Sequence, residues 1–284
     1  MPGVQNSLSV LLDPSGQMKL AEQYKGVLEN VQKLAVSTKL KNTELSGDPT
    51  TGSVEAKRFV NATSQAYGTA RTGGAGNKVK GKTVTVKIDT DREFVEEIEQ
   101  KDISLLGVDG LLAKRAANHA LRLAAELDEA FFAKAVAAGS QFTPAEGVTA
   151  IQDIVEDAIV SLSILKTNYI DGLDRSQMQI TFDPQTYSAM RKYLDTVHNT
   201  NVDTTTEEFM AFHGVRCDQS NRLPKGVHFV LEIVGSIAQP VISKPYGAER
   251  IPLSEAIAVE LFFYYGTEAV TPETILYYGT PSNS

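Results

Sequence analysis

The chain has 284 residues, of which 42% are hydrophobic and 22% are charged, and its formal net charge is −8. This length and composition are typical of a soluble globular protein with one large domain or two modest ones. The net negative charge argues against a protein whose main role is to bind nucleic acid through a basic surface. The single cysteine, Cys217, excludes an intrachain disulfide and fits a reducing compartment. A lone thiol of this kind is usually a small buried hydrophobe.

No apolar run in the sequence is long enough to span a membrane. The longest, residues 256–265, has ten residues and contains Glu260. The N-terminal run Leu8–Leu12 is too short for the apolar region of a signal peptide, and no basic residue precedes it. We therefore expect a protein that is made and used inside a cell and has no membrane partner.

Residues 17–36 have helical periodicity, because apolar side chains recur every three or four positions. Asp13, Pro14 and Ser15 supply a start signal for this helix. The apolar stripe is narrow and consists of Leu20, Tyr24, Val27, Val31 and Leu34. It fits a surface helix that packs on its own domain and equally an arm that packs on a partner.

The segment Gly76–Thr83, GNKVKGKT, fits the phosphate-loop pattern G-x-x-x-x-G-K-[ST] at every fixed position. A phosphate loop follows a buried strand and begins a helix, whose N-terminus binds the phosphates. Here no strand precedes the pattern, and residues 82–89 alternate with a period of two, as a strand does. With a second strand at residues 54–60, they predict a long hairpin with a glycine-rich tip. We expect no nucleotide and no other cofactor.

The predicted hairpin and the segment after it have opposite charges. Residues 52–88 contain seven basic side chains and one acidic one, a net charge of +6, whereas residues 89–109 contain two basic and eight acidic ones, a net charge of −6. A projecting basic hairpin is not expected to fold back on the next segment, but it can lie on the same segment of another copy. Alternatively, both are solvated surfaces. The predicted contact residues are Arg71, Lys78, Lys80, Lys82, Glu93, Glu96, Glu97 and Glu99.

The strongest helical pattern covers residues 109–138, which are rich in alanine and would form a helix about 45 Å long. We assign His119 and Asp128 to its polar face and Gly139 to its C-terminal cap. Further helices are expected at residues 150–167, from Pro184 after the cap Asp183, and at 205–212. Strands are expected at residues 178–182, 214–218, 226–235, 256–266 and 273–279. Because strands and helices mix without regular βαβ alternation, the fold class is α+β.

No pattern of catalytic or metal-ligating residues stands out. His213 and Cys217 are two ligands where zinc needs three or four, and Asp171–Asp174 lacks further ligands of a calcium loop. The acidic run at residues 91–102 contains paired carboxylates, but nothing suggests a pocket around them. We therefore predict no catalytic residue, no metal site and no enzyme activity.

The order of parts resembles the major capsid proteins of tailed bacteriophages, which have the Hong Kong 97-type fold. The resemblance rests on a basic hairpin followed by a long alanine-rich helix, on a strand–Asp183-Pro184–helix unit, and on the closing sequence YYGTEAVTPETILYYG. It implies an N-terminal arm at residues 1–51, an extended E-loop at 52–88, a peripheral domain with a spine helix at 89–149, and an axial domain at 150–250. The closing strands at residues 251–284 are left without a domain assignment.

The resemblance implies a structural function. Copies would assemble as pentamers and hexamers into an icosahedral shell, first as a procapsid, around packaged double-stranded DNA that is not bound by sequence. Only about fifty residues precede the hairpin, so the resemblance implies either a separate scaffolding protein or a short sequence that is removed on maturation, and a portal is expected as well. The protein would be assembled in the host cytoplasm and reside in the virion. No spacing identifies an asparagine partner for a lysine crosslink, so none is predicted.

Three alternatives remain open from the sequence. One is an encapsulin-like nanocompartment shell that encloses protein cargo, which the long N-terminal segment disfavours. The second is a nucleotide-binding enzyme that uses Gly76–Thr83, and the third is a structural protein of a tail or portal.

Overall fold

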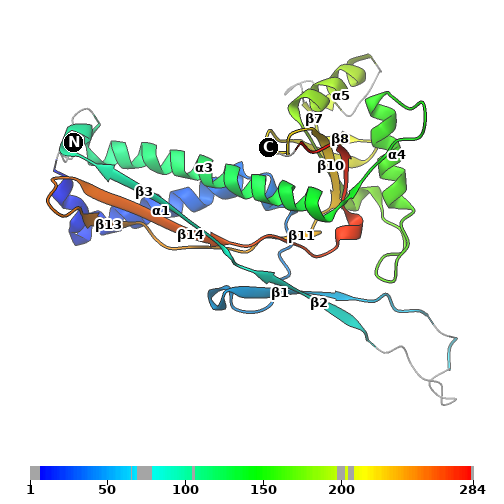
Figure 1. The fold of residues 1–284 in the computed structure, drawn as a ribbon, viewed down its shortest axis with the longest axis horizontal. Coiled ribbons are helices and arrows are strands. Elements are labelled where there is room, and N and C mark those ends of the chain that lie inside the picture. The colour runs from blue at the N-terminus through cyan, green and yellow to red at the C-terminus, as the bar shows by residue number, and fades with distance from the viewer. Residues whose placement is uncertain are drawn as a thin grey trace.

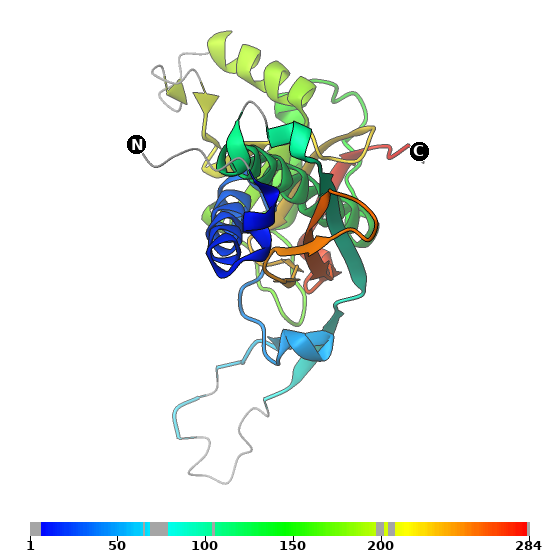
Figure 2. The same cartoon turned by 90° about the vertical axis from the view of Figure 1, so that its left-hand side faces the viewer.

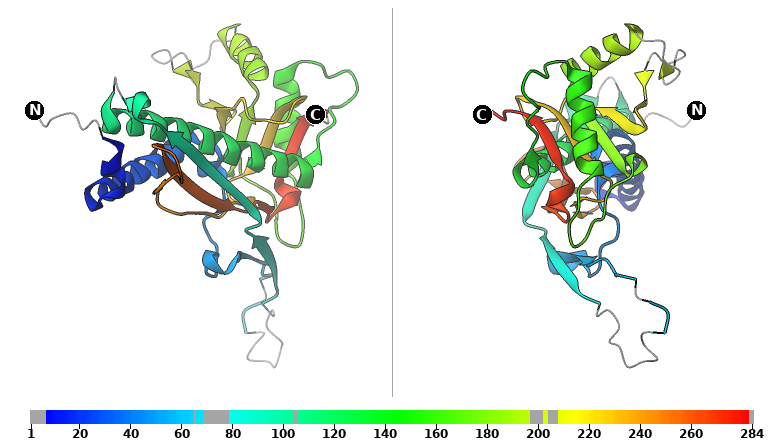
Figure 3. Two further views of the ribbon diagram at one scale, coloured as in Figure 1. Left: turned by 60° about the vertical axis from the view of Figure 1, so that its left-hand side comes forward. Right: turned by 90° about the vertical axis from the view of Figure 1, so that its right-hand side faces the viewer.

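The computed structural model describes residues 7–64, 66–68, 79–103, 106–196, 202–203 and 208–282. They form an elongated body of two helices on a sheet, a compact body at one end of it, and a hairpin that extends to one side (Figures 1 and 3). The helices are α1 (Pro14–Leu34), α2 (Ser37–Leu40), α3 (Gly107–Ala138), α4 (Ile151–Ser163) and α5 (Pro184–Thr196). The longer strands are β1 (Ser53–Phe59), β2 (Gly81–Lys87), β3 (Thr90–Ile98), β5 (Met178–Phe182), β9 (Val215–Gln219), β10 (Val227–Ile233), β13 (Gly247–Arg250), β14 (Ile257–Tyr265) and β16 (Leu276–Gly279). The short ones are β4 (Ser140–Gln141), β6 (Val202–Asp203), β7 (Glu208–Phe209), β8 (Ala211–Phe212), β11 (Ile237–Ala238), β12 (Val241–Ser243) and β15 (Glu268–Ala269).

The elongated body is built around β14, which pairs with β3 on one side and with β12 and β13 on the other. Alternate residues of β14 are buried, and they face α1 and α3, which lie side by side on that face of the sheet (Figure 2). The core between them includes Val27 and Val31 of α1, Leu123 of α3 and Phe263 of β14. Asp13 is the extended residue before α1 and Pro14 its first residue, so the predicted start is confirmed.

The compact body is a six-stranded sheet in the order β4-β16-β10-β5-β9-β8. The central strand β5 is buried along its whole length, and α4 and α5 contribute to the main core on one face. The last turns of α3 pack on the other face through Phe131 and Phe132, so this helix joins the two bodies. The predicted cap of α5 is confirmed, because Asp183 Oδ1 accepts a hydrogen bond from the Thr186 N–H at 2.8 Å.

The hairpin consists of β1 and β2, which pair in antiparallel register from Ser53↔Lys87 to Phe59↔Gly81, as the sequence predicts. Its base is buried through Val54, Ala56 and Val86, which pack against Ala238 and Val270. Gly266 passes so close to the hairpin that a Cβ at this position would lie 1.7 Å from the Lys87 carbonyl oxygen. This tight approach fixes the place where β2 leaves the body.

Three segments differ from the sequence prediction. The acidic segment after the hairpin forms a nine-residue strand, β3, rather than a connector. The helix predicted at residues 150–167 ends at Ser163. Strands β7 and β8 occupy the described part of residues 205–212, where we predicted a helix. Here His213 and Gly214 both have positive φ, as a two-residue hairpin turn requires, and they turn β8 back onto β9.

Two side chains and one glycine in or beside α3 were also misassigned. His119 and Asp128 are buried rather than on a polar surface. The Asp128 carboxylate accepts hydrogen bonds from the N–H groups of Val36 (3.1 Å) and Ser37 (2.9 Å) at the start of α2. Gly139 has a φ of −76° rather than a left-handed cap conformation, and it is needed because a Cβ would lie 2.6 Å from the Ala135 carbonyl oxygen.

The closing residues divide between the two bodies: β14 joins the sheet of the elongated body, and β16 joins the sheet of the compact one. The domain borders drawn from the resemblance stay predictions.

Candidate inter-subunit surfaces

The described part of the hairpin presents an exposed basic surface. Lys57, Lys80, Lys82 and Lys87 are exposed, and no residue in the described ranges pairs with any of them. Phe59 lies between them on β1 and is 59% exposed. Of the predicted hairpin contacts, the structure therefore places Lys80 and Lys82 on an accessible surface, whereas Arg71 and Lys78 lie outside the described residues.

One basic side chain of the hairpin is neutralised within the chain. The Arg58 guanidinium is only 9% exposed, forms an ion pair with the Glu273 carboxylate, and stacks over the ring of Tyr169 at 4.2 Å. The neighbouring Asn61 N–H donates to the Asn168 carbonyl oxygen at 3.0 Å. We call Arg58, Glu273 and Tyr169 the hairpin clasp. It attaches the hairpin to the compact body, and no local sequence pattern indicates it.

The acidic segment has two faces because it is a strand. Phe94, Glu96 and Ile98 point toward α3, whereas the alternate residues of β3 point to the opposite, outer face of the sheet. In the same register, the outer side of β14 adds one more acid and two aromatic rings. This outer face consists of Asp91, Glu93, Val95, Glu97, Glu260, Phe262 and Tyr264. Its acids and apolar groups complement the lysines and Phe59 of the hairpin.

Glu96 is not available for a contact with another copy. It forms an ion pair with Arg115, and its Oε1 lies 3.3 Å from Nε2 of His119. The His119 ring stacks on Phe94 with centroids 5.0 Å apart, and its Nδ1 lies 2.6 Å from the Tyr246 hydroxyl. The hydrogen bond from Arg115 holds the pKa of Glu96 below its usual range, and burial lowers the pKa of His119. These groups lock β3 onto α3.

The four acidic residues predicted to contact another copy therefore fall into two groups, those that are free to do so and those that already have a partner within the chain. Glu93 and Glu97 lie exposed on the outer face, and no partner for either lies in the described part of the chain. Glu99 is exposed but pairs with Lys101 at 2.5 Å. The alternation of side chains along a strand would have predicted that Glu96 faces inward and that Glu93 and Glu97 face outward. This prediction is possible only if β3 is recognised as a strand.

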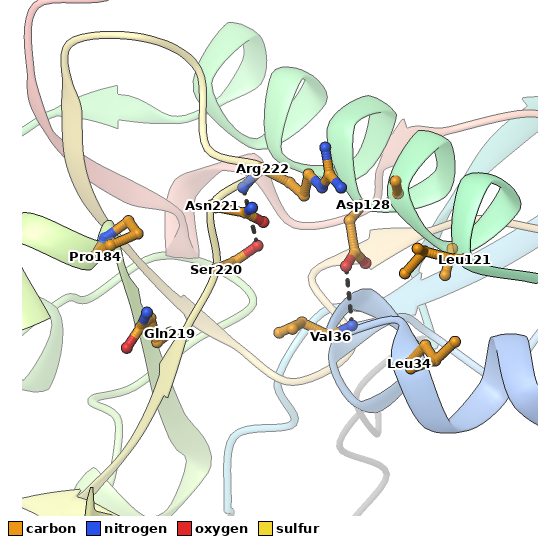
Figure 4. A pocket seen from close by; sticks show the side chains of 11 residues that line it. Leu34, Val36, Leu121, Asp128, Pro184, Gln219, Ser220, Asn221 and Arg222 are labelled. Atoms are coloured by element: carbon orange, nitrogen blue, oxygen red, sulfur yellow. Dashed lines mark hydrogen bonds between the residues drawn. The ribbon is translucent and has the colours of Figure 1, made fainter. Parts of the chain in front are cut away.

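A groove at the junction of the two bodies offers no evident chemistry. This open pocket of about 390 Å³ lies between the ends of α1 and α2, the middle of α3 and the loop after β9 (Figure 4). The charged groups in it are already paired: Asp128 accepts the Val36 N–H, and Arg222 forms an ion pair with Glu129 at 3.0 Å. Leu34 and Leu121 supply its apolar wall.

The remaining candidates for chemistry are also accounted for. Gly81, Lys82 and Thr83 of the phosphate-loop pattern lie in β2, so a strand stands where a phosphate loop needs a helix. His213 pairs with Glu156 at 2.6 Å, and burial raises the pKa of Cys217 to about 12. Within the described ranges, no three His, Cys, Asp or Glu side chains are placed to hold a metal ion, and no helix is long and apolar enough to cross a membrane.

No protein-family model matches the sequence, and no curated protein does either. Solved structures do match the fold. A structure from Mycobacterium phage Che8 is 16% identical, with a TM-score of 0.59 over 80% of this chain and 84% of that one. The capsid of Cyanophage P-SCSP1u is 15% identical, with a TM-score of 0.64 over 88% and 89%. A virus-like particle from Pyrococcus furiosus is 10% identical, with a TM-score of 0.56 over 90% and 97%.

These matches cover 80–90% of the chain, at identities that show a shared fold alone. The chain thus has the fold of the phage capsid proteins. This confirms the α+β class and the capsid-type architecture that the sequence resemblance implied.

Proposed function

We propose that this chain is the major capsid protein of a tailed bacteriophage, which assembles as pentamers and hexamers into an icosahedral shell around double-stranded DNA. The main support is the match over most of the chain to capsid structures, including those of two phages. The protein would then reside in the virion after assembly in the host cytoplasm. A scaffolding protein and a portal would be its partners during assembly, and it would perform no catalysis.

The proposed contact between copies joins the basic hairpin of one copy to the outer sheet face of the next. Lys80, Lys82 and the other exposed lysines of the hairpin would meet Glu93 and Glu97, with Phe59 against the apolar side chains of that face. Opposite charges of this kind set the register and the rate of encounter more than the affinity. Because the pairs are exposed, salt would weaken them, with a screening length of about 8 Å at physiological ionic strength.

Charge reversal tests this contact. We expect Lys80→Glu with Lys82→Glu to leave the thermal unfolding of the single chain unchanged and to prevent shell formation, measured by sedimentation and negative-stain microscopy. Adding Glu93→Lys and Glu97→Lys to the same chain should restore shells, since the charges are then exchanged. Reversal of Glu22, an exposed acid on α1, is the control, because α1 covers the opposite face of the sheet. Shells from the first variant in normal yield would refute the contact. A wild-type chain that forms no closed particles, either alone or together with a scaffolding protein, would refute the capsid function.

A second candidate is a shell that encloses protein cargo, as an encapsulin-like nanocompartment does. The observation that supports this candidate is the match to a virus-like particle from Pyrococcus furiosus, which covers 97% of that chain. The contents of purified particles decide between the two: DNA supports the phage capsid, and a cargo protein supports the nanocompartment. A tail or portal protein would instead give rings or tubes, which the symmetry of the particles reveals.

A further inference from the structure

The turn that joins β13 to β14 has a conformation that its sequence does not favour. Ser254 N–H donates to the Ile251 carbonyl oxygen at 3.2 Å, which closes a four-residue turn with Pro252 at its second position and Leu253 at its third. Leu253 has a φ of +61°. Turns with proline second and a positive φ third favour glycine or asparagine at the third position, because a Cβ is strained there.

The leucine is also fully exposed. The residue has 110% of the reference exposure, the largest value among the exposed large hydrophobic residues in the described part of the chain. The turn lies at the end of the elongated body opposite α4 and α5, and it points away from the rest of the chain (Figure 1). Within one chain, then, Leu253 is both strained and solvated. Strain of this kind in a well-held turn points to a role outside the fold.

The turn itself is well held. The Ile251 N–H donates to the Ala256 carbonyl oxygen at 3.2 Å, and the Ala256 N–H donates to Ser254 Oγ at 3.1 Å. Ala256 and Ile257 are buried below it. These contacts fix the direction in which the leucine projects, so its exposed position is a property of the fold.

Charged side chains and a hollow flank Leu253 in the turn. Arg250 on one flank and Glu255 on the other are exposed, and neither has a partner in the described part of the chain. Beside the leucine lies an open hollow of about 410 Å³, lined by residues 250–255. One short turn thus offers an apolar projection, a hollow, a cation and an anion. Each feature has its counterpart in the same turn of another copy.

We propose that residues 250–255 form a contact between copies of this chain, in which Leu253 of one copy enters the hollow of the next and Arg250 pairs with Glu255 across the contact. Such a head-to-tail contact closes into a ring when the rotation between copies divides a full turn. The proposal rests on the capsid function. It adds a second contact between copies, at the end of the elongated body that lies farthest from the compact body. The occupant is a second copy because the charges and the shape match within the turn.

Replacing the leucine separates assembly from folding. Leu253→Gly removes the projection and relieves the strain, so the melting temperature of the single chain should stay the same or rise. Shell yield should fall at least about tenfold, as for an anchor residue at the centre of a contact. Leu253→Met keeps the apolar bulk and should assemble normally. A wild-type shell yield from Leu253→Gly would overturn the proposal. The turn would then either bind another protein or make no contact.

A charge exchange tests the identity of the occupant. Arg250→Glu alone places two carboxylates together and should reduce shell yield, as should Glu255→Arg alone. The double variant should recover most of it, which only a contact of the turn with its own copy predicts. A double variant no better than the singles would overturn the pairing. If the wild-type chain forms no shells either alone or with a scaffolding protein, this contact and the capsid function are both refuted. Normal wild-type shells with insensitive variants refute only the contact.

Discussion

Glu232 is expected to make the folded chain less stable as the pH rises, and Glu232→Gln should remove this dependence. The residue lies on β10, is 1% exposed, and accepts one hydrogen bond, from Ser236 Oγ at 2.6 Å. Its other carboxyl oxygen, Oε1, has no hydrogen-bond partner in the described part of the chain. Burial raises its pKa from 4.5 to about 8 and outweighs the opposing effect of the hydrogen bond from Ser236. The carboxyl is therefore protonated in the folded chain at neutral pH.

The magnitude follows from the two pKa values. Because the folded-state pKa is raised, the folded chain retains a proton that the unfolded chain releases, so stability falls between pH 4.5 and pH 8. Each pH unit in this range costs about 1.4 kcal/mol, which gives about 3 kcal/mol at pH 7 and about 5 kcal/mol above pH 8. Glutamine has the same shape and no charge. We therefore expect Glu232→Gln to match the wild type near pH 4.5 and to exceed it by these amounts at higher pH.

Thermal unfolding of the unassembled chain, followed by circular dichroism at pH 5, 7 and 8.5, measures this difference. At about 2–4 °C for each kcal/mol, the variant should melt roughly 10–20 °C above the wild type at pH 8.5, and the two melting temperatures should nearly coincide at pH 5. Glu249→Gln, at an exposed position of β13, is the matched control for the removal of one carboxylate. If the melting temperature of Glu232→Gln exceeds that of the wild type by the same amount at pH 5 and at pH 8.5, the assignment of a protonated buried carboxyl is refuted.

Two further predictions concern the attachment of the hairpin. Gly266→Ala should lower the free energy of unfolding by at least about 2 kcal/mol, because its Cβ would collide with the Lys87 backbone, whereas Gly26→Ala, in an open position of α1, should raise it by about 0.5–1 kcal/mol. Thermal melts of the two variants check both signs, and equal melting temperatures would contradict the close approach. Arg58→Met leaves the Glu273 carboxylate without its cation, so we expect a loss of about 2 kcal/mol and faster amide exchange in β1, measured by hydrogen exchange. Unchanged exchange in β1 would show that the clasp does not hold the hairpin.

The sequence predicted the elements whose signals are local. The start of α1 at Asp13 and Pro14, the α5 cap at Asp183 and the alternation of β2 each depend on neighbouring residues, and the structure has all three. His119 also had a local signal, since it lies three residues after Ala116 and four before Leu123, both buried on α3. Its polarity led to a surface assignment. The contacts with Glu96 and Tyr246 that make it a core residue come from other elements.

What the sequence could not predict depends on distant pairings. Both faces of β3 carry acids, so the alternation of apolar and polar residues that marks a strand is masked by Glu96. Only the pairing with β14 and the ion pair with Arg115 show why an acid points inward. The clasp joins Arg58 to Glu273 across 215 positions of the chain, and no local pattern relates the two.

The arrangement of β2 and β3 explains why the opposite charges of the hairpin and the outer face stay apart within one chain. The two strands follow each other with only residues 88 and 89 between them, and in Figure 1 they run nearly in line, the hairpin in one direction and β3 in the other. Gly266 fixes this junction against Lys87, and the clasp holds the hairpin farther out. The hairpin therefore cannot fold back over Glu93 and Glu97 without breaking both attachments. A second copy is free of this restraint, so the complementary surfaces of the chain favour association over self-neutralisation.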